Sequence, residues 1–337
     1  MQVHLQMLAF LFKQAIKNNI MFYRLLFIFL FSLSSVGISY SNEDPWLIID
    51  NAAQATKFLN YKGIFLSQHD KDIKSIEITH AKINNQEFIK MNVLDGSPGE
   101  VLSQGKTIYV YNTIENNVII QKRKQQRLFP AIFPSNIDSI KKFYRLSVGK
   151  NERIAGRLSQ LVVLSPIDTF RYSHHLWLDK KTSLPLKIIV ADQAGNIIEQ
   201  TSFTQISMIK DESLDWFKPE VDPLKNYIFN DHIVGHGIAK QPFWTIKKIP
   251  PGYKEVDFIT KRIPGLNILS HQLVFSDGLS YVSLLIKPIT RGQKPKVGQL
   301  NLGVNNICAR YHNGYQIMAV GSVPLTTCNN FSESIEF

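Results

Sequence analysis

A meander of short apolar strands between residues 156 and 189 limits the possible folds of this chain more than any other feature. One apolar run, 161–164, ends at a turn-forming segment, and a second run spans 172–178. Because alternate residues of a strand face opposite ways, the pattern places two sets of side chains on opposite faces. One face carries Tyr172, His174, Leu176 and Leu178, and the other carries Arg171, Ser173, His175 and Trp177.

The connections in this region have the length of hairpin turns. Residues 179–183 are polar, and Pro185 stands at the start of the next run, where no ladder hydrogen bond needs its missing N–H. The stretch therefore predicts an antiparallel meander with one apolar face. It holds no catalytic constellation, and on its own it is sheet scaffold.

The same type of pattern fills the first two thirds of the chain. Apolar residues at helical spacing predict one helix over 51–60, beginning near 44–45, and a second, short helix is predicted at 137–144. Further strands are predicted at 64–66, 73–78, 88–94, 107–111, 118–120, 186–191 and 197–209. Such a set predicts a curved sheet wrapped around a helix, with a concave apolar face that can enclose a cavity.

The last hundred residues predict a second, smaller α+β domain. Asp277 and Gly278 separate two apolar runs within 273–286, which is a strong hairpin signal. A strand follows at 314–321, and Pro324 opens a final helix at 325–335. Cys308 and Cys328 are a disulfide candidate if the chain is exported to an oxidising compartment.

The N-terminus predicts export. Residues 21–41 combine Arg24, the apolar run 25–33 and small residues at the end, which is typical of a signal peptide cleaved before Asn42. Residues 1–20 would then be an upstream extension. An uncleaved N-terminal anchor is the alternative.

The charge of the chain limits the classes of partner that it can bind. The full chain carries a formal net charge of +11. An exported basic protein does not meet the chromosome, so we predict no nucleic-acid partner. Acidic lipids or an acidic protein fit the compartment better.

Chemistry-bearing motifs do not point to an enzyme. Neither a nucleophile elbow nor a zinc-protease motif occurs, and His174 and His175 are adjacent, so a strand turns them to opposite faces. His232 and His236 have ligand spacing, but Gly235 and Gly237 argue against the helix that would bring them together. We therefore predict no catalytic residue, no metal site and no cofactor.

Several segments, in order along the chain, resemble the MucB/RseB family. They read L-N-Y-K-G at 59–63, I-T-H at 78–80, L-D-G at 94–96, E-V-L at 100–102, I-A-G-R at 154–157, F-R-Y at 170–172, L-W-L-D at 176–179, L-P-L-K at 184–187 and F-S-D-G-L at 275–279. Members of that family are periplasmic regulators of the sigma-E envelope-stress response. The resemblance implies a periplasmic location and a mainly β fold: a large curved antiparallel half-barrel on a helix, similar to the carriers LolA and LolB, plus a smaller α+β domain.

The resemblance also implies a function. Such a protein binds the periplasmic domain of a membrane-spanning anti-sigma factor of the MucA/RseA type, protects it from proteolysis and releases it on sensing lipid or lipopolysaccharide. A LolA-like lipid or lipoprotein carrier is the alternative, and a homo-oligomer is left open. The implied domains are the LolA-like domain 42–212, a linker 213–240 and the C-terminal domain 241–337. Residues expected to line the lipid cavity are Trp46, Phe65, Tyr109, Tyr111, Phe133, Tyr172, Leu176 and Leu178.

Overall fold

The computed structural model of this chain describes residues 44–69, 72–112, 117–122, 128–134, 136–210, 213–219, 228–231, 244–262, 269–290, 292–302 and 305–337. The predicted extension 1–20, the signal peptide 21–41 and the pair His232 and His236 lie outside them. Pro45–Phe337 forms one compact unit, so the predicted division at 213–240 stays a prediction. None of the helices in the described residues has the length and apolar character that a membrane span requires.

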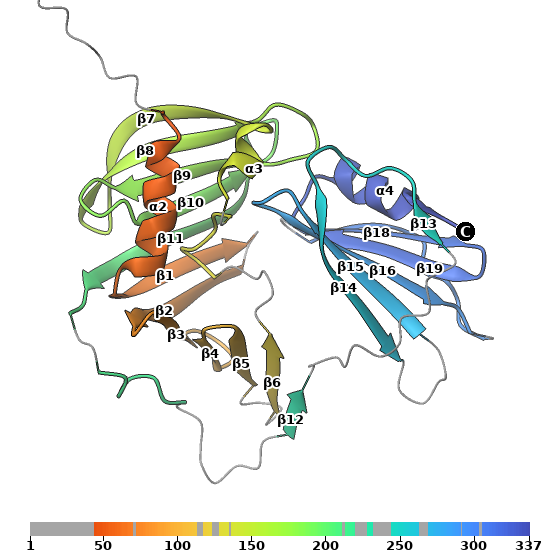
Figure 1. Cartoon of the computed structure of the whole chain (residues 1–337), viewed down its shortest axis with the longest axis horizontal. Helices are drawn as coiled ribbons and strands as arrows, with labels where there is room; N and C mark the ends of the chain where they lie inside the picture. Colours follow the sequence, from red (N-terminus) through yellow and green to blue (C-terminus); the bar gives the residue numbers. More distant parts are fainter. Residues whose placement is uncertain are drawn as a thin grey trace, which may run out of the picture. The chain divides into compact units, whose positions relative to one another are not determined.

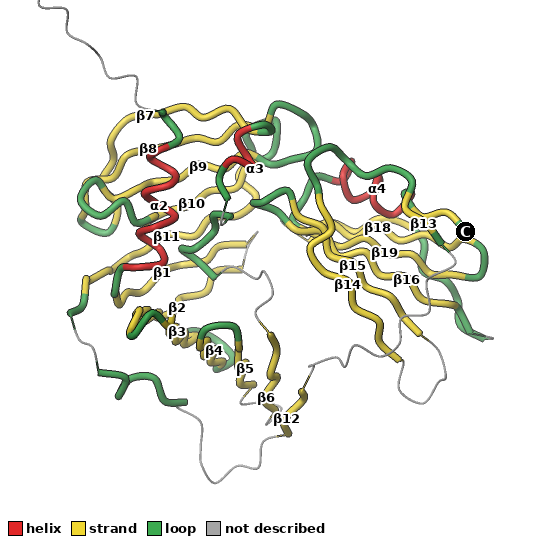
Figure 2. Tube along the Cα trace, in the orientation of Figure 1, coloured by secondary structure: helices red, strands yellow, loops and turns green. Residues whose placement is uncertain are grey.

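The first part of this unit is a twelve-stranded sheet, the larger sheet, in the order β12-β6-β5-β4-β3-β2-β1-β11-β10-β9-β8-β7 (Figures 1 and 2). All neighbouring strands are antiparallel except β12 and β6. The strands are β1 (Tyr61–His69), β2 (Asp72–Ile83), β3 (Gln86–Val93), β4 (Gly99–Gln104), β5 (Thr107–Asn112), β6 (Asn117–Lys122), β7 (Tyr144–Ile154), β8 (Arg157–Pro166), β9 (Ser173–Asp179), β10 (Pro185–Ala191), β11 (Ile197–Met208) and β12 (Ile228–Asp231).

Most neighbours in this sheet are also neighbours in sequence, as a meander predicts. The exceptions are the parallel pairing of β12 with β6 and the pairing of β1 with β11, which runs from Tyr61 opposite Met208 to His69 opposite Glu199. This pairing joins the strands before the short helix to the strands after it. The predicted large antiparallel sheet is therefore confirmed.

Helix α2 (Leu47–Phe58) lies across the concave face of the larger sheet (Figure 1). Its buried stripe is made of small or slender residues, Ile49, Ala52, Ala53, Ala55 and Thr56. Small side chains let the helix backbone approach the sheet closely, and apolar burial of this kind stabilises by roughly 25 cal/mol per Å². The helix and the sheet share two core clusters. The expected curved sheet on a helix is thus present.

The short helix differs from its prediction. Helix α3 spans only Asp138–Lys141, and Tyr144 is the first residue of β7. Lys142 still has helical dihedral angles, so the helix gives way to a strand within two residues. The apolar pattern at 137–144 mixed one helical turn with the start of a strand, and periodicity over eight residues cannot separate the two.

The second part of the unit is a six-stranded antiparallel sheet, the smaller sheet, in the order β14-β15-β16-β19-β18-β17. Helix α4 (Leu325–Glu333) packs on it through the fully buried Cys328 and Phe331. The predicted hairpin is confirmed, since β15 and β16 join at 277–280. The strands are β14 (Lys254–Arg262), β15 (Leu269–Ser276), β16 (Tyr281–Pro288), β17 (Gly298–Leu302), β18 (Asn305–His312) and β19 (Tyr315–Gly321), with β13 (Thr245–Ile246) and β20 (Ile335–Glu336) forming a separate pair.

Candidate functional site

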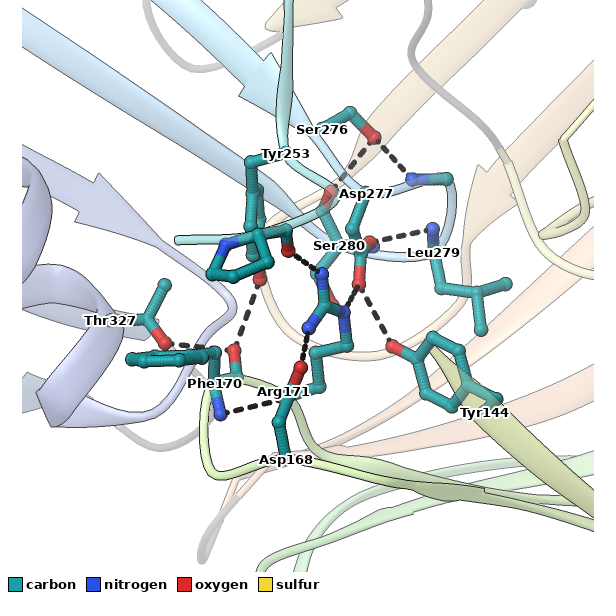
Figure 3. A network of polar contacts seen from close by, with 12 residues as sticks. Tyr144, Asp168, Phe170, Arg171, Tyr253, Ser276, Asp277, Leu279, Ser280 and Thr327 are labelled. Atoms are coloured by element: carbon teal, nitrogen blue, oxygen red, sulfur yellow. Dashed lines mark hydrogen bonds and ion pairs between the residues drawn. The ribbon is translucent and has the colours of Figure 1, made fainter. Parts of the chain in front are cut away.

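The loop between β8 and β9, residues 167–172, inserts into the part of the chain that carries the smaller sheet (Figure 3). The loop is shaped by Asp168, whose carboxylate accepts a hydrogen bond from the backbone N–H of Phe170 at 3.0 Å. This turn directs Arg171 away from its own sheet. We call the contacts that follow the clasp, which comprises Arg171, Asp277, Tyr144 and Tyr253.

Arg171 is the centre of the clasp. Its side chain is fully buried, and its Nε donates to Oδ2 of Asp277 at 2.9 Å. Its other two nitrogens donate to the carboxylate of Asp168 and to the carbonyl of Pro251. The guanidinium also lies over the ring of Tyr253, 5.1 Å from the centroid. A rigid, planar group with five donors suits a site with partners in several directions.

Asp277 accepts hydrogen bonds from the clasp residues through one carboxylate oxygen and stabilises the turn that follows it through the other. Its Oδ2 accepts a second hydrogen bond from the hydroxyl of Tyr144 at 2.9 Å. Its Oδ1 accepts from the backbone N–H groups of Leu279 and Ser280 at 2.9 and 2.8 Å. Burial and the nearby Asp277 carboxylate hold the pKa of Tyr144 well above its usual value, so this hydroxyl stays a donor.

A second set of contacts surrounds the clasp. The carbonyl of Phe170 accepts from the hydroxyls of Tyr253 at 3.2 Å and Thr327 at 2.8 Å. The hydroxyl of Tyr172 donates to the carbonyl of Val323 at 3.1 Å, and burial raises the pKa of Tyr172 to about 12. Three consecutive residues of one loop therefore bind the smaller sheet and its helix.

Two glycines make this close approach possible. Gly252 has φ +84°, and a Cβ there would lie 2.5 Å from Nη2 of Arg171. Gly278 has φ +110°, and its Cβ would lie 2.7 Å from the side chain of Ile140. Both positions need a left-handed backbone and no side chain.

A cleft of about 1060 Å³ lies beside the clasp. Asp277, Gly278 and Tyr253 line it from the smaller sheet's side, and α2, β2 and the α3 region line it from the larger sheet's side. Its apolar lining includes Phe133 and Phe143, and its lysines are Lys57, Lys82, Lys142 and Lys254. We call it the lysine cleft.

A second cleft, of about 1320 Å³, lies beside Tyr172. The described residues that line it include Asp72 and Asp192 but neither lysine nor arginine. At its edge Nε2 of His69 lies 3.0 Å from the carbonyl oxygen of Leu302. The loop 167–172 thus contributes to both the clasp and this second cleft.

The structure brings together only some of the residues expected to line a lipid cavity. Trp46, Phe133, Leu176 and Leu178 pack in one cluster beneath α2. Phe65 belongs to the neighbouring cluster, Tyr109 and Tyr111 are half-buried on β5, and Tyr172 lies in the second cleft. Leu176 and Leu178 are packed core residues, Trp46 is half-buried against the same cluster, and Phe133 also lines the lysine cleft. The lipid cavity stays a prediction.

The strand pattern misplaced two residues of the loop. Tyr172 precedes β9 instead of sharing the inner face with His174 and Leu176. Arg171, expected on the outer face, is fully buried. The reason is that β9 begins only at Ser173, so the alternation of a strand does not apply to the loop before it.

Cys308 on β18 and Cys328 on α4 are both buried and are free thiols in the structure. Burial raises the pKa of Cys308, and a hydrogen bond with Cys328 opposes that rise. The two side chains are therefore adjacent. The disulfide stays a prediction.

No group of three or more His, Cys, Asp or Glu side chains among the described residues could hold a metal ion. Sequence pattern does not single out Tyr144 or Tyr253, and it identifies Asp277 only as part of a turn. Arg171 and Asp277 are 106 residues apart, so no local pattern could pair them.

Comparison with protein families decides what kind of protein this is. The model of the MucB/RseB N-terminal domain matches residues 45–221, and the model of the MucB/RseB C-terminal domain matches residues 239–336. The chain belongs to the MucB/RseB family. The resemblance noted in the sequence is thus confirmed.

Relatives with established names cover most of this MucB/RseB chain. The sigma-E factor regulatory protein RseB of Escherichia coli (strain K12) is 24% identical over 294 residues, which cover 84% of this chain and 87% of RseB. The sigma factor AlgU regulatory protein MucB of Pseudomonas aeruginosa is 25% identical over 305 residues, covering 88% and 91%. A crystal structure of MucB in complex with MucA(peri) matches with a TM-score of 0.70 at 21% identity, covering 87% of this chain and 98% of that one.

Proposed function

We propose that this chain is a periplasmic negative regulator of sigma-E-type signalling that binds the periplasmic part of a membrane-spanning anti-sigma factor. Its named relatives are regulators of sigma factors, and one is known in complex with MucA(peri). The observation in this chain that carries the proposal is the lysine cleft, whose walls come from both sheets. A surface formed by both sheets is suited to an extended segment of a protein partner.

The proposal includes the consequences of binding. A segment held in the cleft is shielded from proteases, because a protease needs the chain extended and accessible. Lipid or lipopolysaccharide then releases the segment by binding elsewhere on the protein with a preference for the free form. A coupling of about 1–3 kcal/mol changes the affinity roughly 5- to 150-fold, which suffices for a switch.

The test is a titration of the chain, without residues 1–41, with the purified periplasmic domain of the anti-sigma factor from the same organism. We expect a complex without lipid, a longer lifetime of that domain in the presence of its protease, and weaker binding when lipopolysaccharide is added. If no complex forms without lipid, the regulator function is refuted. If the complex forms but lipopolysaccharide leaves the affinity unchanged, binding stands and lipid release is refuted.

A further inference from the structure

The lysine cleft is lined by four lysines whose charge the described residues leave largely uncompensated. Lys57 on α2 and Lys82 on β2 are half-buried, and Lys142 and Lys254 are exposed. Within the described part of the chain, none of these four ammonium groups has an ion pair. Lys82 instead places Nζ 3.8 Å from the centroid of the Phe58 ring, a contact that leaves its charge in place.

The carboxylates that line the same cleft compensate for the lysines only in part, because two of the three are paired with other cations. Asp138 pairs with Lys141 at 3.0 Å and Asp277 with Arg171 at 2.9 Å, whereas Glu87 contacts His80 at 3.3 Å. Lys141 and Arg171 balance Asp138 and Asp277, so among the described residues the four cleft lysines face only the carboxylate of Glu87, and the net charge of the cleft lining is positive. Like charges gathered in one concave site raise the local positive potential and attract an anionic partner.

The general basicity of the chain does not account for this. The second cleft has a similar volume and lies beside the loop 167–172, yet among the described residues no lysine or arginine lines it. Positive charge is thus concentrated on one side of the clasp.

The positions of the lysines favour one class of ligand. They come from four elements on both sides of the cleft, and a volume of about 1060 Å³ exceeds the needs of most small molecules. Because the lysines come from both walls of the cleft, carboxylates spaced along an extended chain suit them better than one compact headgroup does. Phe133, Phe143 and Tyr253 add apolar surface between the charges.

We propose that the lysine cleft binds an acidic, extended polypeptide segment, whose carboxylates are held by Lys57, Lys82, Lys142 and Lys254. This inference rests on the proposed function, and it adds the chemistry of the partner segment and the residues that select it. Aspartate and glutamate side chains of the segment would meet the lysines, and its apolar side chains would meet the aromatic rings.

The test compares wild type with a variant in which all four lysines become glutamine, K57Q/K82Q/K142Q/K254Q. A matched control carries K150Q/K180Q/K181Q/K294Q, four exposed lysines that do not line the cleft. Binding of the anti-sigma factor's periplasmic domain is measured calorimetrically in 50 and 500 mM NaCl. Exposed ion pairs contribute on the order of two- to fivefold in affinity each, so we expect the cleft variant to bind at least about tenfold more weakly at low salt and the control to match wild type.

Two further probes separate this inference from the proposed function. The first is a fluorescent dodecapeptide of alternating Glu and Ala, with a Gln and Ala peptide as its uncharged counterpart. The second is a phosphatidylglycerol vesicle. We expect only the acidic peptide to bind wild type with an affinity that the cleft variant loses. Circular dichroism of both variants confirms that each is folded.

The outcomes are distinct. If wild type does not bind the anti-sigma domain, the proposed function fails, and the acidic peptide alone then decides the inference. If the cleft variant binds the anti-sigma domain and the acidic peptide as wild type does, the inference is wrong. If the variant loses only vesicle binding, the cleft takes a lipid headgroup and the inference is equally wrong.

Discussion

Replacing Arg171 with methionine should destabilise the chain far more than an ordinary surface substitution. Methionine has a similar length but leaves the fully buried carboxylate of Asp277 without its cation. Removing one member of a buried ion pair costs about 3–5 kcal/mol, because the remaining charge stays desolvated. The hydrogen bond from Tyr144 to Asp277 remains, which favours the lower end of that range.

The assay is urea unfolding followed by tryptophan fluorescence. With a slope of roughly 3 kcal/mol per M for a chain of this size, the midpoint should fall by about 1 M or more. The double variant with Asp277→Asn is the informative step, because asparagine keeps an oxygen for the N–H groups of Leu279 and Ser280. The loss of unfolding free energy in the double variant should be roughly 1–3 kcal/mol smaller than the sum of the losses in the two single variants.

The matched control is Arg157→Met. Arg157 pairs with Asp179 at 2.7 Å, but its side chain is 25% exposed, and both residues belong to the larger sheet. Water can enter the space that the Arg157 side chain leaves, so the loss of unfolding free energy should be smaller, about 1–2 kcal/mol. The reasoning is refuted if Arg171→Met costs less than about 1 kcal/mol, or if the losses at Arg171 and Asp277 add without coupling.

Three other predictions concern stability. Gly278→Ala should lower the free energy of unfolding by roughly 2 kcal/mol more than Gly314→Ala, measured by thermal unfolding. Both glycines have positive φ, but only Gly278 has a side chain within 4 Å of the added Cβ. Equal losses for the two variants would contradict the crowding at Gly278. His174 is buried, and desolvation lowers its pKa to about 4. Since the unfolded chain binds the proton at a higher pH, the free energy of unfolding should fall by up to about 3 kcal/mol as the pH drops from 6.5 toward 4. The substitution His174→Phe should remove this pH dependence. We expect Cys308 and Cys328 to form the predicted disulfide after export. A thiol assay in denaturant without reductant should then detect no free thiol, and reduction of the disulfide should lower the free energy of unfolding by about 3 kcal/mol. Two reactive thiols would refute the bond.

The sequence was sufficient for features that depend on local pattern. Alternation along 173–178 predicts the burial of His174, Leu176 and Leu178, although Trp177 on the opposite face is buried as well. The small apolar stripe of α2 likewise predicts its buried face, because a strand repeats every two residues and a helix every 3.6. The Asp277–Gly278 turn was likewise visible, since its side-chain and backbone chemistry act within four residues. The family could be recognised because such segments keep their order along the chain.

The candidate site could not be predicted in the same way. The strand pattern predicts Arg171 on an outer face because it counts residues 171 and 172 as part of the strand, whereas β9 begins at Ser173. The same kind of pattern assigns Asp277 only to a hairpin. The lysines of the cleft are scattered from residue 57 to residue 254 and look like ordinary surface charge. Whether a lysine is neutralised depends on the carboxylates that the fold brings near it.

The sequence by itself therefore determined the mainly β architecture, the helix on the concave face and the membership of the MucB/RseB family. The tertiary structure decided that one loop of the larger sheet is held by the smaller sheet's hairpin, and that unpaired lysines collect on one side of that contact. The physical reason is range: propensity and periodicity act over a few residues, whereas burial of a charge and the potential of a cleft are sums over residues that only folding brings together.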